Sequence, residues 1–141
     1  DQSLVKPLAQ VMANLGVNRG MVVYGQDSLD EISMSAPTTV CEVKDGEFLS
    51  YVITPEQFGF TRCSKDELIG GSPQDNAQIA LAILKGEKGP RRDAVVLNSA
   101  AAIHIAKGIS IEDAIREAQE VIDSGKALAQ LEQFAALTNQ E

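Results

Sequence analysis

The chain has 141 residues and a mass of 15.0 kDa, the size of a single domain with a substantial core. Its composition is 44% hydrophobic and 23% charged, which excludes a disordered or fibrous chain. The net charge of −8 gives a surface that repels nucleic-acid phosphates, so we expect no nucleic-acid partner. No apolar run approaches the roughly twenty residues of a membrane span, so we expect no membrane partner either.

Apolar residues at helical spacing predict a first helix over residues 3–15, with Ser3 as its N-cap and Gly16 as its end. The apolar run at residues 21–24 follows. Four apolar residues without alternation indicate a strand covered on both faces, as in a parallel sheet. Residues 25–37 are rich in Gly, Asp and Ser and predict a loop.

Two β-prone runs, residues 39–43 and 48–53, flank Asp45-Gly46, which is a strong signal for an antiparallel hairpin. Residues 56–71 are irregular. Helix starts with Ser N-caps then predict C-terminal helices. The first of these helices begins at Ser72, and the second runs from about Asp93 to Lys107. The third helical region begins at Ser110 and has a break at Ser124-Gly125. The predicted class is α/β, with a buried parallel strand, an antiparallel hairpin and C-terminal core helices.

The two cysteines, Cys41 and Cys63, match neither a metal-ligand spacing nor a disulfide framework. No leader with a basic segment followed by an apolar one begins the chain. Both features favour a reducing compartment, so we expect structural thiols in a cytoplasmic protein. Because the chain opens at Asp1, almost directly on a predicted helix, we interpret it as a piece of something longer.

The loop after the first predicted strand carries the clearest chemical signal. Asp27, Asp30 and Glu31 place three carboxylates within five residues. In open α/β sheets ligands bind outside the carboxyl ends of the strands, and Mg²⁺ is commonly held by one or two carboxylates plus waters and substrate phosphates. The pattern fits a divalent ion that carries a phosphorylated substrate. On residue types alone, a solvated acidic turn in which Asp30 or Ser28 satisfies turn amides stays open.

Five segments, in order, resemble motifs of the anthranilate phosphoribosyltransferases. The likeness covers essentially the whole chain but only the C-terminal part of such an enzyme. Two residues depart from the family pattern, since Tyr24 stands where the family has His and Ser28 where it has Gly. The matching segments are Val22–Ser33 (VVYGQDSLDEIS), Thr54–Gly59 (TPEQFG), Leu68–Gly71 (LIGG) with Asn76-Ala77, Gly89–Asn98 (GPRRDAVVLN) and Ile122–Ala127 (IDSGKA).

The resemblance implies that residues 1–141 are the C-terminal part of the large α/β phosphoribosyltransferase domain, which is nucleoside phosphorylase/phosphoribosyltransferase-like. The family's N-terminal helical domain and glycine-rich phosphate loop do not occur in these residues. The implied reaction moves phosphoribosyl from 5-phosphoribosyl-1-pyrophosphate (PRPP) to anthranilate and releases pyrophosphate, a step of tryptophan biosynthesis. The resemblance also implies that the intact enzyme is a homodimer. The family's Asp-Glu pair binds Mg²⁺, which assigns Asp30 and Glu31 as the metal ligands. We expect this piece alone to be inactive.

Two other functions stay open, and so does a third option, a purely structural fragment kept only as a folding unit. A pyrimidine nucleoside phosphorylase-like enzyme shares the general fold, but the Asp-Glu-Ile-Ser loop and the Arg-Asp-Ala-Val-Val-Leu-Asn helix favour the transferase. A non-catalytic nucleic-acid-binding homologue would be basic, whereas this chain is acidic.

Three further polar residues have structural interpretations. A lone His on an apolar helix is more often packed than catalytic, so we expect His104 to be a hydrogen-bonded core ring. Asn98 is polar within an apolar face, and we expect it to bond to the backbone of a neighbouring loop. Arg92 belongs to a small basic cluster just ahead of a predicted helix start, a combination that can attract phosphate. We favour instead a solvated linker in which Arg92 pairs locally with Asp93 or Asp75.

Overall fold

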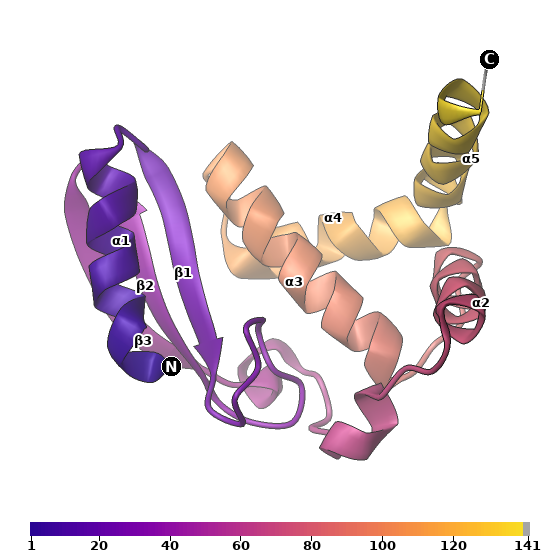
Figure 1. The fold of residues 1–141 in the computed structure, drawn as a ribbon, viewed down its shortest axis with the longest axis horizontal. Coiled ribbons are helices and arrows are strands. Elements are labelled where there is room, and N and C mark those ends of the chain that lie inside the picture. The colour runs from indigo at the N-terminus through magenta and orange to yellow at the C-terminus, as the bar shows by residue number, and fades with distance from the viewer. Residues whose placement is uncertain (140–141) are drawn as a thin grey trace.

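The computed structural model describes residues 1–139. A three-stranded sheet lies between one helix on its outer face and a group of helices on the other (Figure 1). The elements are α1 (Val5–Asn14), β1 (Arg19–Gly25), β2 (Thr38–Lys44), β3 (Glu47–Ile53), α2 (Pro73–Leu84), α3 (Pro90–Lys107), α4 (Ile111–Asp123) and α5 (Lys126–Thr138), with short 3-10 helices at Gln2–Leu4, Pro55–Phe58 and Lys65–Leu68.

The predicted hairpin is confirmed. β2 pairs antiparallel with β3 in a register that places Lys44 opposite Glu47. The two residues between them, Asp45 and Gly46, have φ of 50° and 84°. Positive φ at both central positions is what a type I′ turn requires, and its twist matches that of the strands it joins.

The direction predicted for the first strand is wrong for the residues that the structure describes. β1 pairs antiparallel with β2, and the sheet order is β1-β2-β3. The connecting loop, residues 26–37, holds no helix that could carry a parallel crossover. The predicted coverage of both faces is right, because Val22 and Tyr24 pack on the α1 side while Met21 and Val23 pack on the α3 side. An apolar run indicates that both faces of a strand are covered, but it does not indicate whether the strand pairs in parallel or antiparallel.

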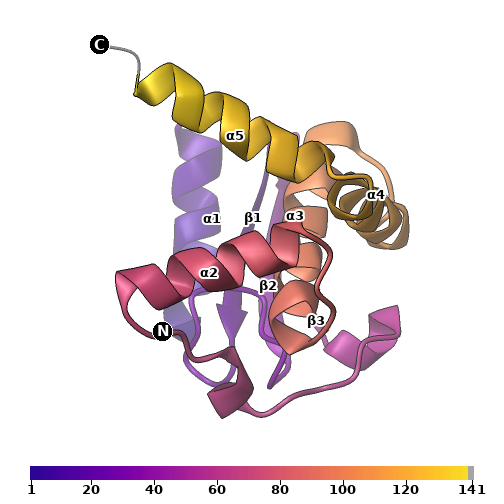
Figure 2. The same cartoon turned by 90° about the vertical axis from the view of Figure 1, so that its right-hand side faces the viewer.

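Helix α3 is the core helix, as the sequence predicts, and it begins at Pro90 rather than near Asp93. Val96, Leu97 and Ala100 are fully buried against α4, the sheet and the loop after β1. Helices α2 and α5 lie on the side of α3 and α4 that is remote from the sheet (Figure 1, Figure 2). The arrangement is of the α/β class.

The helix starts predicted at Ser72 and Ser110 are confirmed, but the first one, at Ser3, is wrong. Ser72 and Ser110 cap α2 and α4 by accepting hydrogen bonds from the backbone three residues on. Helix α1 begins at Val5, and Ser3 instead lies in a 3-10 turn capped by Asp1. If Ser3 were the N-cap, the first helical bond would need the N–H of Pro7, which proline lacks.

A polar cluster joins the sheet to the C-terminal half of α3. The ring of His104 contacts Ile109 O through Nδ1 at 2.5 Å and Glu42 Oε1 through Nε2 at 3.3 Å. Glu42 also lies 3.5 Å from Arg19 Nη2 and accepts a hydrogen bond from Tyr51 Oη at 3.2 Å. The prediction that His104 is a packed, hydrogen-bonded ring is confirmed.

The same cluster predicts a loss of stability at alkaline pH. Burial, together with the charge and hydrogen bond of Glu42, raises the pKa of Tyr51 to about 12. The folded state therefore holds the phenol proton more tightly than the unfolded state, so this stability is present below pH ~10 and is lost as pH rises toward ~12. We expect wild type to lose about 1–2 kcal/mol more than Tyr51→Phe over this range, allowing for solvent screening.

Urea unfolding at stepped pH measures this difference. Tyr24→Phe is the matched control, because no hydrogen bond of its hydroxyl is present in residues 1–139. Equal alkaline losses in all three proteins would contradict the prediction.

No single helix in residues 1–139 is long and apolar enough to cross a membrane. Helices α3 and α4 reach that composition only when taken together, across a bend of 117°.

Candidate functional site

The loop after β1 folds back on the strand and leaves two acids at its outer edge. Gly25 N donates to Leu29 O at 2.9 Å, and Ser28 N donates to Gly25 O at 2.9 Å. Gly25 and Leu29 thereby form an isolated antiparallel bridge. The chain then turns through Asp30 and Glu31, which are both exposed, before it re-enters the core at Ile32.

Asp30 and Glu31 line a groove of about 570 Å³. The groove lies between the loop, α2 and the N-terminal half of α3. Its other lining residues are mostly apolar, and the polar exceptions are Asn76 on α2 and Arg91 on α3. The structure therefore places the predicted pair side by side at a crevice.

The pair offers two carboxylates, which are hard oxygen ligands. Among the described residues, no group of three His, Cys, Asp or Glu side chains lies close enough to hold a metal ion. A structural zinc site or a calcium cage needs more protein ligands than this. Mg²⁺ keeps several waters and shares its shell with substrate phosphates, so two carboxylates suffice for it. The donor set fits magnesium in a ternary complex.

The third predicted carboxylate, Asp27, is turned into the loop and braces it. Its Oδ2 accepts hydrogen bonds from Ser33 Oγ at 3.0 Å and from Ser35 Oγ, while its Oδ1 is buried without a partner in residues 1–139. Burial works to raise the pKa of Asp27, but the hydrogen bonds from Ser35 and Ser33 outweigh it and the pKa is lowered. Of the three acids, Asp30 and Glu31 line the groove, whereas Asp27 belongs to the internal bracing of the loop.

One departure from the family pattern has a structural meaning. Ser28 has φ of 71°, in the left-handed region that favours glycine. Glycine at this position, as in the family motif, fits the same turn without strain. Serine adopts this conformation here at a cost of about 1 kcal/mol.

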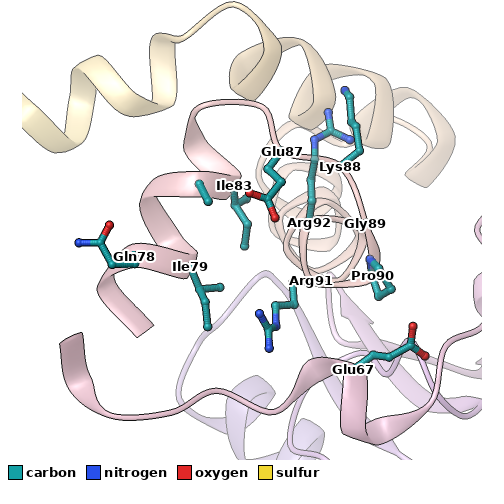
Figure 3. A pocket seen from close by; sticks show the side chains of 11 residues that line it. Glu67, Gln78, Ile79, Ile83, Glu87, Lys88, Gly89, Pro90, Arg91 and Arg92 are labelled. Carbon is teal, nitrogen blue, oxygen red and sulfur yellow. The ribbon is translucent and has the colours of Figure 1, made fainter. Parts of the chain in front are cut away.

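A second groove, of about 510 Å³, lies at the start of α3, and Figure 3 shows its lining. Arg92 Nη2 and Lys88 Nζ both donate to Asp123 Oδ1, at 2.8 and 3.0 Å, whereas Arg91 points elsewhere and donates to Ile69 O at 2.7 Å. The prediction that Arg92 pairs with Asp93 or Asp75 is wrong. Its buried side chain faces the end of α4, so its partner comes from there.

Asn98 bonds to the backbone of a neighbouring loop, as the sequence predicts, and the structure shows that this is the acidic loop. Its side chain binds the N–H and C=O of Ile32, directly after Glu31. Sequence reasoning did not find the bracing role of Asp27 or the wall that α2 gives the groove. The hydroxyls of Ser33, Ser35 and Thr38 were a usable signal for the former, since such residues bond to nearby backbone and carboxylates.

The chain belongs to the glycosyl transferase family, because the a/b domain of that family matches residues 1–128. Among its relatives, the anthranilate phosphoribosyltransferase of Methanobrevibacter smithii is 59% identical over 140 residues, which are 99% of this chain and 42% of the relative. That of Lachnoclostridium phytofermentans is 52% identical, with the same two shares. The resemblance seen in the motifs is confirmed, and the chain spans about two-fifths of the length of these curated relatives.

Solved structures agree on the fold. Anthranilate phosphoribosyltransferase from Thermus thermophilus superposes with a TM-score of 0.87 at 37% identity, over 96% of this chain and 40% of that one. The Saccharomyces cerevisiae enzyme in complex with PRPP and Mg gives a TM-score of 0.87 at 26% identity, over 95% of this chain and 39% of that one. The predicted α/β fold class is confirmed by these neighbours.

Proposed function

We propose that this chain forms the C-terminal part of the large α/β domain of an anthranilate phosphoribosyltransferase. The observation that carries the proposal is the adjacent pair Asp30 and Glu31, exposed together at the rim of a groove within the matched segment. The names of the relatives, and the yeast structure that holds PRPP and Mg, support the same assignment. The proposed reaction transfers phosphoribosyl from PRPP to the amine of anthranilate.

Asp30 and Glu31 are proposed to hold Mg²⁺ against the diphosphate of PRPP. In the reaction the anthranilate nitrogen bonds to ribose C1 and loses a proton, while the C1–O bond breaks and its electron pair leaves on pyrophosphate. A bound Mg²⁺ stabilises and orients this growing negative charge. The two acids act as ligands, and neither is required as a general base.

The remaining features of the protein follow from the same proposal. We propose a homodimer, a cytoplasmic location and no nucleic-acid partner, the last because a net charge of −8 opposes a phosphate backbone. The glycine-rich phosphate loop of the family is absent from this sequence, and backbone amides of such loops supply the main anion cradle. We therefore propose that catalysis needs, besides this chain, the phosphate-binding residues that its longer relatives contain.

Pyrophosphate release tests the function in a full-length enzyme that contains these residues. We expect release from PRPP to require both anthranilate and Mg²⁺. Phosphorolysis of pyrimidine nucleosides without anthranilate-dependent release would favour the phosphorylase instead, and binding of DNA or RNA in a low-salt gel shift would favour the non-catalytic homologue.

The isolated chain provides a second test. Residues 1–141 alone should give no anthranilate-dependent consumption of PRPP, because the main phosphate cradle is missing. Turnover by this piece would show that the chain already holds a complete site, contrary to the proposal.

A further inference from the structure

The acidic pair lies between two fixed points of the backbone. On one side, Leu29 is held to the end of β1 by the hydrogen bond from Gly25 N. On the other side, Ile32 is 3% exposed and enters the main core. Only Asp30 and Glu31 separate these two points. The path of the backbone at the pair is therefore set by how firmly Leu29 and Ile32 are held.

Asn98 holds the second point with both ends of its amide. Its Oδ1 accepts from Ile32 N at 2.9 Å, and its Nδ2 donates to Ile32 O at 3.0 Å. This grip joins positions that are 66 residues apart in the chain. It fixes the two peptide groups that flank Ile32, and the first of these is the peptide bond between Glu31 and Ile32.

The Asn98 side chain is itself held in one orientation. Its Nδ2 also donates to Ala94 O, one turn back on α3, at 3.0 Å. Its neighbours on the helix, Val96 and Leu97, are fully buried, so the helix cannot shift without opening the core. The grip on Ile32 is therefore rigid, and not a loose surface contact.

The serine–aspartate brace closes the loop behind Ile32. Ser33 N donates to Thr38 Oγ1 at 2.9 Å, and Ser33 Oγ donates to Asp27 Oδ2 at 3.0 Å. A Cβ on Gly25 would lie 2.9 Å from Asp27 Oδ1 and 3.1 Å from Ser33 Cβ, so strand end and loop pack closely. The backbone around the pair is ordered, while its two carboxylates stay exposed.

We propose that Asn98 is a positioning residue for the metal-binding pair, acting through Ile32 to hold Asp30 and Glu31 where both carboxylates reach one ion. This inference rests on the proposed function. Residues that orient the ligands of a metal, rather than bind it, commonly change its affinity 10–100-fold when they are replaced. A purely structural Asn98 would change stability and leave metal affinity intact.

The test is Mn²⁺ binding, followed by electron paramagnetic resonance, in the full-length enzyme that contains these residues. We expect Asn98→Leu, of similar volume, and Asn98→Ala to weaken Mn²⁺ binding about tenfold or more. The Mg²⁺ concentration for half-maximal activity should rise in parallel, and kcat should recover at saturating Mg²⁺. Ile115→Val, a mildly destabilising change in the buried face of α4, is the control and should bind Mn²⁺ like wild type.

The outcomes separate the two proposals. If wild type and Asp30→Asn/Glu31→Gln bind Mn²⁺ alike, the metal site of the proposed function fails, and the role of Asn98 fails with it. If the pair binds Mn²⁺ but neither Asn98 variant weakens it, only the inference about Asn98 is overturned.

A measurement on the wild type guards against variants that do not fold. The amide of Ile32 should exchange its hydrogen slowly without any metal, because Asn98 already holds it. Exchange that slows only when metal is added would overturn the inference, since the loop would then be ordered by the ion and not by Asn98.

Discussion

Asp30→Asn combined with Glu31→Gln should lower pyrophosphate release at physiological Mg²⁺ by about 100-fold or more in the full-length enzyme. Metal stabilisation of a leaving group supplies several kcal/mol, and each 1.36 kcal/mol is a factor of about ten in rate. Both side chains are exposed, and no hydrogen bond from either is present in residues 1–139, so the fold should tolerate the change. The measurement is the initial rate of release across a Mg²⁺ titration.

A charge-matched control separates site chemistry from overall charge. Asp45→Asn with Glu47→Gln removes two exposed acids from the hairpin turn at the opposite end of β1. We expect this control to keep the wild-type rate and Mg²⁺ dependence. An unchanged Mg²⁺ dependence in the Asp30/Glu31 double variant would count decisively against the pair as metal ligands.

Leu97→Ala should destabilise the protein by about 2–5 kcal/mol, the largest stability effect that we expect from a single change. Leu97 is fully buried at the centre of α3, where helices, sheet and acidic loop meet. Its truncation loses apolar burial and leaves a cavity that rigid neighbours cannot fill. Urea unfolding with a constant m-value measures the change.

Two controls on α3 define the origin of that loss. Leu97→Met keeps the volume and should lose less than about 1.5 kcal/mol. Val95→Ala removes methyl groups from a side chain that is 39% exposed, and it should have the smaller effect of a surface change. A Leu97→Ala loss no larger than that of Val95→Ala would show that the core is not packed as described.

Local signals in the sequence predicted local structure well. Asp45-Gly46 predicted the hairpin because a two-residue turn with positive φ tolerates few residue types. Ser72 and Ser110 predicted helix starts because their hydroxyls satisfy amides three residues away. The same reasoning failed for Ser3, because Pro7 lies four residues later and lacks the N–H that the first helical hydrogen bond would need.

Relations between distant segments could not be predicted in this way. The direction of β1 depends on which strand pairs with it, and an apolar run carries no information about that choice. The partner of Arg92 comes from α4, 31 residues away. For the site, the family resemblance assigned Asp30 and Glu31, and the structure adds the groove and the loop anchors. That the two acids bind metal stays a prediction.

Helix α3 is tied to the sheet side of the molecule at two heights. Asn98 binds the loop beyond the end of β1, and His104 contacts Glu42 of β2 six residues further along, about 9 Å by helical rise. With a single contact, α3 could still rotate about that point. Two contacts at different angles around the helix axis resist both translation of α3 along its axis and rotation about it. A displacement of the C-terminal end of α3 would consequently move the helix as a rigid body and shift the acidic turn with it.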